Sequence, residues 1–571
     1  LRGPFSVLYG NSSGGVVQVF TEPGDGPPVV TSTLASGSQG LMRPGLRVSG
    51  STSGFRYAVS ANHFESDGWR DHSEASRDVG NARLDFERGE GNNWTLIANR
   101  LQLTANDPLG LTRAQFQSAP RVADAAALQF DTRKTVRQDQ VGVVHDRALG
   151  GGQSLRLMLY AGQRETTQFQ SIPVATQTNA LHPGGVIGLG RRYAGTDLRW
   201  TSKRKTEQGD IEFVAGISLD TLNEHRQGWQ NFSGATLGVE GALRRDEDNR
   251  VSNVDPYAQL VWKFAPRWTL TAGVRHSSVR FRSSDHYIVG ANSDDSGSVR
   301  YSATLPVAAL MFALSPELHL YAAASRGFET PTFNELAYRP SGGTGLNFAL
   351  QPSSSTNIEV GVKGRARIGE ALRTEWNVTA FQTMTADELV TQSNVGGRST
   401  FQNAGATRRR GVEASWTALL GPAWRLQFAQ TWLDATYRDG FVTCAATPCA
   451  AAALAIPAGN RIPGTARSVT AAELAWQPPR GWRGGIEARR SSRVFANDAN
   501  LEAAPAFTTL ALNGGYVFDV ARWSIAAVGR IDNVLNRRYA GSVIVNEGNS
   551  RFFEPAPGRT WVLKLSASYA F

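Results

Sequence analysis

The sequence predicts an all-β protein, a transmembrane antiparallel β-barrel of about 22 strands. Three observations lead to this prediction. The last eleven residues alternate between apolar and small polar side chains, the connections between predicted strands alternate between short and long, and most tryptophans stand beside the short connections. A barrel of this kind hides its membrane signal, because only every second residue of a strand faces lipid.

The carboxy-terminal stretch, 561–571, is typical of a strand that crosses a membrane. One side of an extended chain carries a face with aromatic ends: Trp561, Leu563, Leu565, Ala567, Tyr569 and Phe571. The other side is small and mostly polar: Val562, Lys564, Ser566, Ser568 and Ala570. Ten steps of about 3.3 Å, tilted by about 40°, rise roughly 25 Å, which is the height of the apolar band of an outer-membrane barrel.

The connections separate into two lengths, as expected for a barrel with short turns on one rim and long loops on the other. The predicted short connections are 88–93, 205–210, 264–267, 314–317, 420–422, 477–481 and 518–522. The predicted long ones are 104–131, 168–186, 222–249, 327–354, 438–463 and 532–558. No fixed period of a repeat protein recurs, and no stretch has a convincing helical period.

Tryptophan positions support the same assignment independently. Strands that follow short connections begin near Trp94, Trp268, Trp376, Trp424, Trp482 and Trp523, and strands that precede them end near Trp200, Trp262, Trp416 and Trp476. Such a row is expected at a membrane interface, where the amphipathic indole ring is favoured.

Composition excludes several other classes. The 571 residues contain no linker that divides them and no run of about twenty apolar residues that would form a transmembrane helix. The net charge is +10, but no basic run exceeds 408–410 and no nucleic-acid motif accompanies it, so nucleic acid is not an expected partner. The basic balance fits a polar lumen and anionic lipid.

The two cysteines, Cys444 and Cys449, lie in an Ala-rich long connection. Their spacing predicts a small loop disulfide in an oxidising compartment. The alternative is a two-thiol metal site, but no His, Asp or Glu lies nearby to complete it, so no metal site is expected. The eight histidines form no HExxH or other close metal pair, and nothing marks a catalytic triad, so an enzyme is not expected.

The beginning of the chain differs from the rest. Glycines at 10, 14 and 15 predict a tight turn, followed by a short apolar strand at 16–20. Residues 1–4 have neither the basic region nor the apolar stretch of a signal peptide.

Taken in order, these segments resemble the TonB-dependent outer-membrane receptors, and the likeness covers nearly the whole chain. The opening is similar to the end of that family's plug domain through Arg2, Gly3, Pro4, Tyr9, Gly10, Gly14 and Gly15. Later segments resemble barrel landmarks of the family in the right order: 67–73, 326–336 (RGFETPTFNEL), 359–363, 410–413 and 532–539. Phe571 resembles the terminal aromatic that serves as the assembly signal of bacterial outer-membrane barrels.

The resemblance implies two domains, the end of a plug at 1–28 and a barrel at 29–571. It places most of the plug, with the segment that couples to TonB, upstream of Leu1, so we expect the chain to be a piece of a longer receptor rather than a degenerate one. A barrel that holds only this remnant is expected to conduct ions.

The implied function is import of a scarce, bulky solute across the bacterial outer membrane, with a ferric siderophore as the leading ligand. The implied partners are TonB and its inner-membrane energising complex, and outer-membrane lipid including lipopolysaccharide. We expect a monomer without a cofactor, iron entering only as part of the transported chelate. The alternatives are a cobalamin or heme receptor of the same fold, or a passive porin or adhesin, which would have fewer strands, commonly 16 to 18.

Ligand contacts are expected among aromatic and basic residues of the long loops. The candidates are Trp69, Arg70, Trp229, Tyr287, Phe333 and Tyr338.

Overall fold

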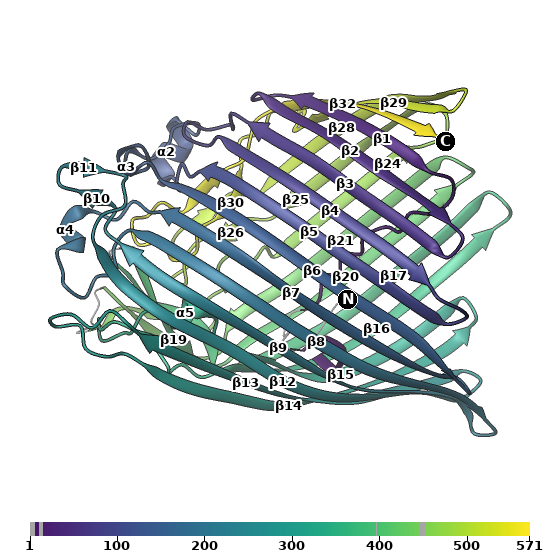
Figure 1. The fold of residues 1–571 in the computed structure, drawn as a ribbon, viewed down its shortest axis with the longest axis horizontal. Helices are drawn as coiled ribbons and strands as arrows, with labels where there is room; N and C mark the ends of the chain where they lie inside the picture. Colours follow the sequence, from purple (N-terminus) through teal and green to yellow (C-terminus); the bar gives the residue numbers. More distant parts are fainter. Residues whose placement is uncertain (1–5, 11–14, 396, 446–448, 450–451) are drawn as a thin grey trace.

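The structure is a computed structural model that describes residues 6–10, 15–395, 397–445, 449 and 452–571. In this part of the chain, 22 antiparallel strands form one sheet that closes on itself (Figure 1). The barrel strands are β1 (Val29–Gly37), β2 (Leu41–Thr52), β3 (Phe55–Ser66), β4 (Ala75–Glu87), β5 (Asn92–Asn106), β6 (Arg133–Gly150), β7 (Gln153–Phe169), β8 (Val186–Thr206), β9 (Gly209–Trp229), β12 (Leu243–Ala265), β13 (Trp268–Asp285), β14 (Gly297–Ser315), β15 (Leu318–Glu329), β16 (Ser353–Ile368), β17 (Leu372–Ala386), β20 (Thr407–Leu420), β21 (Trp424–Tyr437), β24 (Ser468–Trp476), β25 (Gly481–Ser491), β28 (Phe507–Val520), β29 (Trp523–Asp532) and β32 (Thr560–Ala570).

The sheet closes because the first and last barrel strands, β1 and β32, pair along nine residues, with Leu34 opposite Leu565. The predicted alternation of the last strand is confirmed. Leu563 and Leu565 are 46% and 48% exposed on the outer wall. On the inner side of the same pair of strands, the hydroxyls of Thr31 and Ser568 are 2.9 Å apart. The predicted barrel of about 22 strands is therefore correct.

The two rims differ as predicted. Short turns join the strands at the right of Figure 1, and the loops at the left carry every other described element except α1 (Ser6–Tyr9). These are α2 (Arg113–Ser118), α3 (Ala125–Phe130), α4 (Val174–Gln177), α5 (Phe333–Leu336), β10 (Phe232–Ser233), β11 (Thr236–Leu237), β18 (Glu388–Val395), β19 (Arg398–Ala404), β22 (Phe441–Cys444), β23 (Ala452–Ile456), β26 (Val494–Phe495), β27 (Ala503–Ala504), β30 (Ala540–Val543) and β31 (Phe553–Pro555). No described helix is long and apolar enough to cross a membrane.

One predicted loop is too long. The connection expected at 222–249 is only 230–242, because β9 continues to Trp229 and β12 starts at Leu243. These strands extend past the apolar part of the wall, so their outward side chains are polar and the apolar alternation is lost there. Backbone pairing nevertheless continues, with Arg226 opposite Glu247.

The tryptophan row beside the short turns is confirmed. Trp376 and Trp416 are cross-strand partners, and the rings of Trp424 and Trp476 lie 5.1 Å apart. Trp268 packs on Phe312 at 4.5 Å, and Trp523 on Tyr569 at 4.9 Å. This row forms the aromatic girdle that an interface favours.

The strand expected at 16–20 is wrong, since the structure forms no strand there and leaves Val17, Val19 and Phe20 exposed. An apolar alternation becomes a strand only where a partner strand lies in register beside it. The plug-end residues Arg2, Gly3, Pro4 and Gly14, and the side chain of Tyr9, lie outside the described residues. Gly15 is described, with φ 130°.

The turn α1 lies against the barrel wall. Val7 is buried and packs with Val214 and Tyr257. Gly10 follows with φ 77°, and a Cβ added there would lie 3.0 Å from Nη2 of Arg275. Glycine is therefore required for both its backbone conformation and its close approach to the wall.

The loops form their own apolar cores. Leu336 of α5 is fully buried in a cluster with Phe281, Leu305 and Leu346. The segment that resembles a family landmark, 326–336, supplies a capping box, in which the Thr332 hydroxyl accepts from the Glu335 amide and Glu335 accepts from the Thr332 amide. The loops are therefore packed structures rather than free tethers.

Candidate ligand-binding cavity in the lumen

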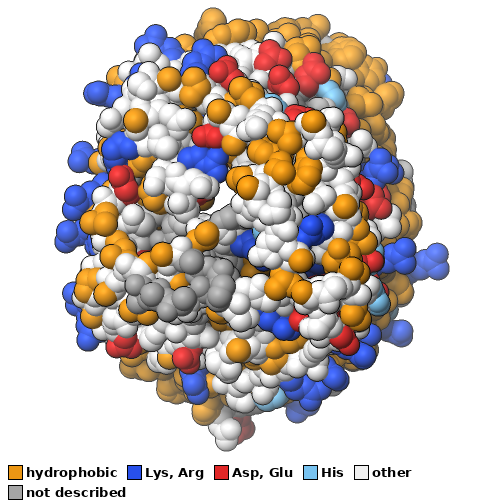
Figure 2. All heavy atoms as spheres, turned by 90° about the vertical axis from the view of Figure 1, so that its left-hand side faces the viewer, with side chains coloured by type: hydrophobic (Ala, Val, Ile, Leu, Met, Phe, Trp, Pro, Cys, Tyr) orange, Lys and Arg blue, Asp and Glu red, His pale blue; other side chains and the backbone are white. Residues whose placement is uncertain are grey.

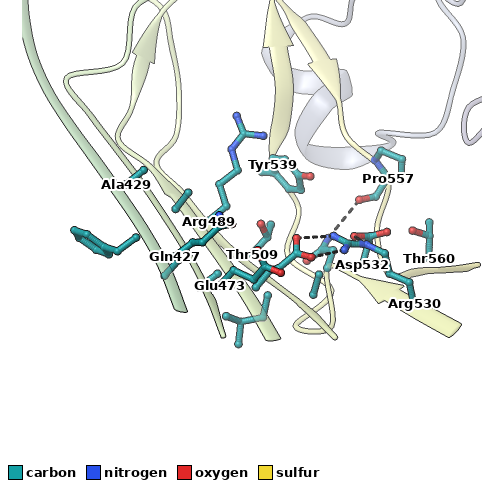
Figure 3. A pocket seen from close by; sticks show the side chains of 18 of the residues that line it. Gln427, Ala429, Glu473, Arg489, Thr509, Arg530, Asp532, Tyr539, Pro557 and Thr560 are labelled. Carbon is teal, nitrogen blue, oxygen red and sulfur yellow. Dashed lines mark hydrogen bonds and ion pairs between the residues drawn. The ribbon is translucent and has the colours of Figure 1, made fainter. Parts of the chain in front are cut away.

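A cavity of about 790 Å³ lies on the inner wall formed by the last third of the chain (Figure 3). Successive side chains of a strand point alternately outward and into the lumen, so only every second residue reaches the cavity. On β25, Ile486 is 42% exposed on the outer wall, whereas Glu487 and Arg489 line the cavity. Thr509 and Arg530, from the two following barrel strands, line it beside them.

The roof of the cavity comes from the loop between β29 and β32, through Tyr539 and Pro557. Asn533 fixes this loop, because its side-chain amide donates to the carbonyls of Arg537 at 2.8 Å and Pro557 at 3.3 Å. Strand wall and loop roof thus enclose a volume within the 300–1,000 Å³ range of pockets for drug-sized molecules.

Two neighbouring arginines pair with the three carboxylates of the cavity wall. Arg530 donates to Glu487 at 2.9 Å and to Asp532 at 2.8 Å, as the dashed lines in Figure 3 partly show. Arg425 donates to Glu473 at 2.9 Å. These five side chains hold one another in position and together carry one net negative charge.

Arg489 is different. Among the described residues it makes no ion pair and no hydrogen bond, and its guanidinium lies 6.0 Å from the Phe507 ring, which itself packs on Tyr539 at 4.3 Å. Figure 3 shows its side chain rising from the wall toward Tyr539. A guanidinium that has no ion-pair partner among the described residues and lies beside two aromatic rings can bind a carboxylate or another planar anion through two parallel hydrogen bonds.

Two of the predicted contact residues, Tyr287 and Tyr338, come together in a second, closed pocket of about 10 Å³. Arg245 and Arg398 lie 5.8 Å and 5.3 Å from the centre of the Tyr338 ring. This space holds at most one water molecule, so in this conformation the two tyrosines pack against the loops.

The other predicted contact residues are dispersed. Arg70 is 8% exposed, and it donates to the carbonyls of Pro108, Leu109 and Val122, which holds two loops together. Phe333 packs edge-on against Phe281 in the loop core. Trp69 lies under Arg121, and Trp229 covers Gly188 at the end of β9.

The sequence prediction missed Arg489 and its neighbours. A signal exists, since 486–489 reads Ile-Glu-Ala-Arg, with charged residues alternating with apolar ones inside a predicted strand. Only the folded structure shows that Tyr539, fifty residues further along the chain, covers them.

Two other predictions concern the cysteines and metal binding. A disulfide joins Cys444 and Cys449 within the loop that follows β21, and their Cα atoms are 5.4 Å apart. In the described part of the chain, no three His, Cys, Asp or Glu side chains form a group that could hold a metal ion.

Figure 2 looks onto the loop end of the barrel. Basic side chains lie around the edge of this face and near its centre, interspersed with acidic and hydrophobic ones. The loop surface is therefore mixed rather than a field of one sign, and selectivity for charge has to come from individual side chains.

Comparison with known proteins identifies relatives of this architecture. The family model described as TonB dependent receptor-like, beta-barrel, matches residues 31–534. Three similar solved structures are the siderophore receptor PiuA from Acinetobacter baumannii (TM-score 0.83, 14% identity, covering 100% of this chain and 85% of that one), the ferric citrate transporter FecA (0.79, 16%, 100% and 83%) and the copper transporter OprC (0.76, 16%, 100% and 85%). At these identities the likeness establishes the fold alone.

Proposed function

Because this chain belongs to the family of TonB-dependent receptor β-barrels, we propose that it imports a ferric siderophore, an anionic iron chelate, across the bacterial outer membrane. TonB and its inner-membrane complex would supply the energy for import. The iron is cargo within the chelate, not a resident cofactor.

The observation that carries the proposal is the cavity of about 790 Å³ with Arg489 as its uncommitted cation. Its volume suits one drug-sized chelate rather than a stream of small solutes. Catecholate and carboxylate chelates of ferric iron carry negative charge. Arg425 and Arg530 pair with the three carboxylates of the wall and leave one net negative charge, which the positive charge of Arg489 balances.

Barrel width supports the same class of solute. A 22-stranded barrel leaves a lumen far wider than a small nutrient needs, and such barrels are stoppered. A wide barrel closed by a stopper suits a solute that is large, scarce and transported one molecule at a time.

The test is growth of an outer-membrane-receptor-deficient strain that expresses the full-length gene, with individual ferric siderophores as the only iron source. We expect growth on at least one anionic chelate and loss of that growth when TonB is deleted. Titration of the detergent-solubilised 571-residue chain should show binding of the same ferric chelate and weaker binding of its iron-free form.

Two outcomes would overturn the proposal. TonB-independent growth would indicate passive diffusion. Rescue by heme or cobalamin, with none of the chelates effective, would assign the receptor to another ligand class of the same fold.

A further inference from the structure

We propose that the small closed pocket beside Tyr338 binds a halide ion such as chloride, and that this ion holds the loops together over the lumen. The pocket is about 10 Å³, and we call it the loop pocket. It lies where four loops meet the start of β12, between residues 181–183, 285–295, 337–345 and Arg398. Two elements at this place, α5 and β19, are neighbours at the lower left of Figure 1.

Two guanidinium groups that line the loop pocket carry a donor without an acceptor. Arg398 is 8% exposed and donates from Nη2 to the carbonyl of Leu181 at 2.9 Å. Arg244 donates from Nη2 to the carbonyl of Asn179 at 2.5 Å. The Nε atom of each arginine is buried and has no hydrogen-bond partner among the described residues. Buried donors of charged groups are normally satisfied, so these two indicate a ligand that accepts hydrogen bonds.

The carboxylates that line the loop pocket already have other partners. Glu247 accepts from Arg245 at 2.9 Å, and Asp295 accepts from Arg339 at 2.8 Å. Asp285 accepts from two backbone amides, at 3.0 Å and 3.3 Å. In the described part of the chain, none of the three forms an ion pair with the two guanidinium groups that lack acceptors.

Positive charge is in excess around the loop pocket. On the lumen side of β9, Arg226 is 5% exposed and is the cross-strand partner of Glu247, but it forms no ion pair with any described residue. Burial, together with the like charges of Arg245 and Arg244, lowers the pKa of the Arg398 guanidinium to about 10. Five arginines thus stand against the three carboxylates: Arg226, Arg244, Arg245, Arg339 and Arg398. Burial of such an excess favours an anion as counter-ion.

The size of the loop pocket selects a halide among anions. The space suits one particle of about the size of a water molecule, so a carboxylate, a phosphate or a ferric chelate is too large for it. A halide ion is only slightly larger than water and accepts hydrogen bonds from several N–H donors at once. Water is the other occupant of this size, but it is neutral and leaves the excess charge unbalanced.

A halide in the loop pocket would contact groups from several loops at the same time. An ion that binds only this closed arrangement stabilises it by mass action. The loops should therefore open more often when no halide is present. This inference goes beyond the proposed import function, because it concerns how the loops close and not which solute they admit.

Hydrogen exchange of the detergent-solubilised 571-residue chain tests the effect of the ion. Sodium chloride is compared with sodium gluconate, both at about 0.15 M so that charge screening is equal. Gluconate is too large for the loop pocket. We expect amides of 287–296 and 337–345 to exchange about tenfold more slowly in chloride, as for an ion at about ten times its dissociation constant. Amides of the barrel strands should exchange alike in the two salts.

The variants are Arg398→Gln and, as the matched control, Arg438→Gln. Arg438 is exposed in the loop after β21 and does not line the loop pocket. The readout is the ratio of exchange rates in the two salts, because loss of the contact with Leu181 alone changes the rates in both salts together. We expect the ratio to fall to about one in Arg398→Gln and to stay at the wild-type value in the control. Heat-modifiable migration on gels confirms that each barrel is folded.

Anomalous diffraction from crystals of the same chain grown in sodium bromide identifies the occupant. We expect a bromide peak within the loop pocket of the wild type and no such peak in Arg398→Gln. Equal exchange of the wild type in the two salts, or a chloride effect that persists in Arg398→Gln, would overturn the proposal. Electron density in the loop pocket without an anomalous peak would show a water molecule there and would overturn it as well.

Discussion

Arg275 donates from Nη2 to Asp255 at 2.8 Å, and both side chains are 3% exposed. From Nη1 the same guanidinium donates to the carbonyl of Val7 at 3.2 Å. One buried ion pair on the wall therefore holds α1 in place.

We expect Asp255→Ala to release α1, because it leaves a buried guanidinium unpaired at a cost of about 3 kcal/mol or more. Hydrogen exchange should become faster in peptides that cover residues 6–10, while the other strands keep their protection. Asp139→Ala is the control, since the contacts of Asp139 are exposed: an ion pair with Arg100 at 3.6 Å and a hydrogen bond from Gln163 at 3.4 Å. Unchanged exchange in α1 would contradict the role of the pair.

Arg489→Gln should weaken binding of an anionic ferric chelate by about tenfold or more, since hydrogen bonds to a charged group contribute about 1.5–3 kcal/mol. The matched control is Arg490→Gln, because Arg490 is the next residue of β25 and points outward. Titration calorimetry on both variants measures the effect. Similar affinity in the two variants would remove Arg489 from the ligand site.

Phe571→Ala should reduce the amount of barrel in the membrane without changing ligand affinity of the inserted fraction. Phe571 is 64% exposed, and its ring packs edge-on against Tyr569 at 5.0 Å, so its loss leaves no cavity. Its backbone amide still donates to Pro28 at 3.0 Å after the substitution. Surface labelling measures the level, with Trp482→Ala as the control for loss of an exposed aromatic. Normal surface levels of the Phe571 variant would refute an assembly role.

Packing of the loops should depend on pH through Asp498. Burial raises the pKa of this carboxyl, although Tyr437 donates to it at 2.6 Å and Asn546 at 2.9 Å. Because the folded state binds the proton more tightly than the unfolded state, the stability of these loops falls as pH rises from the ordinary carboxyl pKa through the raised one.

The measurement is protection of amides near residue 498, corrected for intrinsic exchange rates, at about pH 4 and pH 7. We expect greater protection at the lower pH in the wild type and a flatter profile in Asp498→Asn. A wild-type profile without this slope would contradict the assignment.

Much of the wall could be predicted because its signals are local. The period of two in a strand, the Gly and Pro residues of short turns and the interfacial tryptophans each lie within a few residues of the feature they specify. This is why the last strand, the short-turn rim and the number of strands were predicted correctly. Because the prediction used only local signals, it misplaced both ends of the loop expected at 222–249. There, backbone pairing continues after the apolar alternation has stopped.

The binding surfaces could not be predicted in the same way. Arg70 and Phe333 lie in loops, as expected, but distant loops bury them, and no local pattern reports that. Arg489 becomes a candidate only because Tyr539 covers it and because no acid of the described part of the chain pairs with it. Both facts depend on residues far away in the chain.

The sequence by itself determined that this protein is a membrane-spanning barrel with an inner and an outer face, because alternation along each strand is a property of consecutive residues. Only the tertiary structure decided which side chains on different strands become neighbours. Strand register sets those neighbours, and a shift of one residue would separate Arg250 from Arg282 and Arg280 from Arg300.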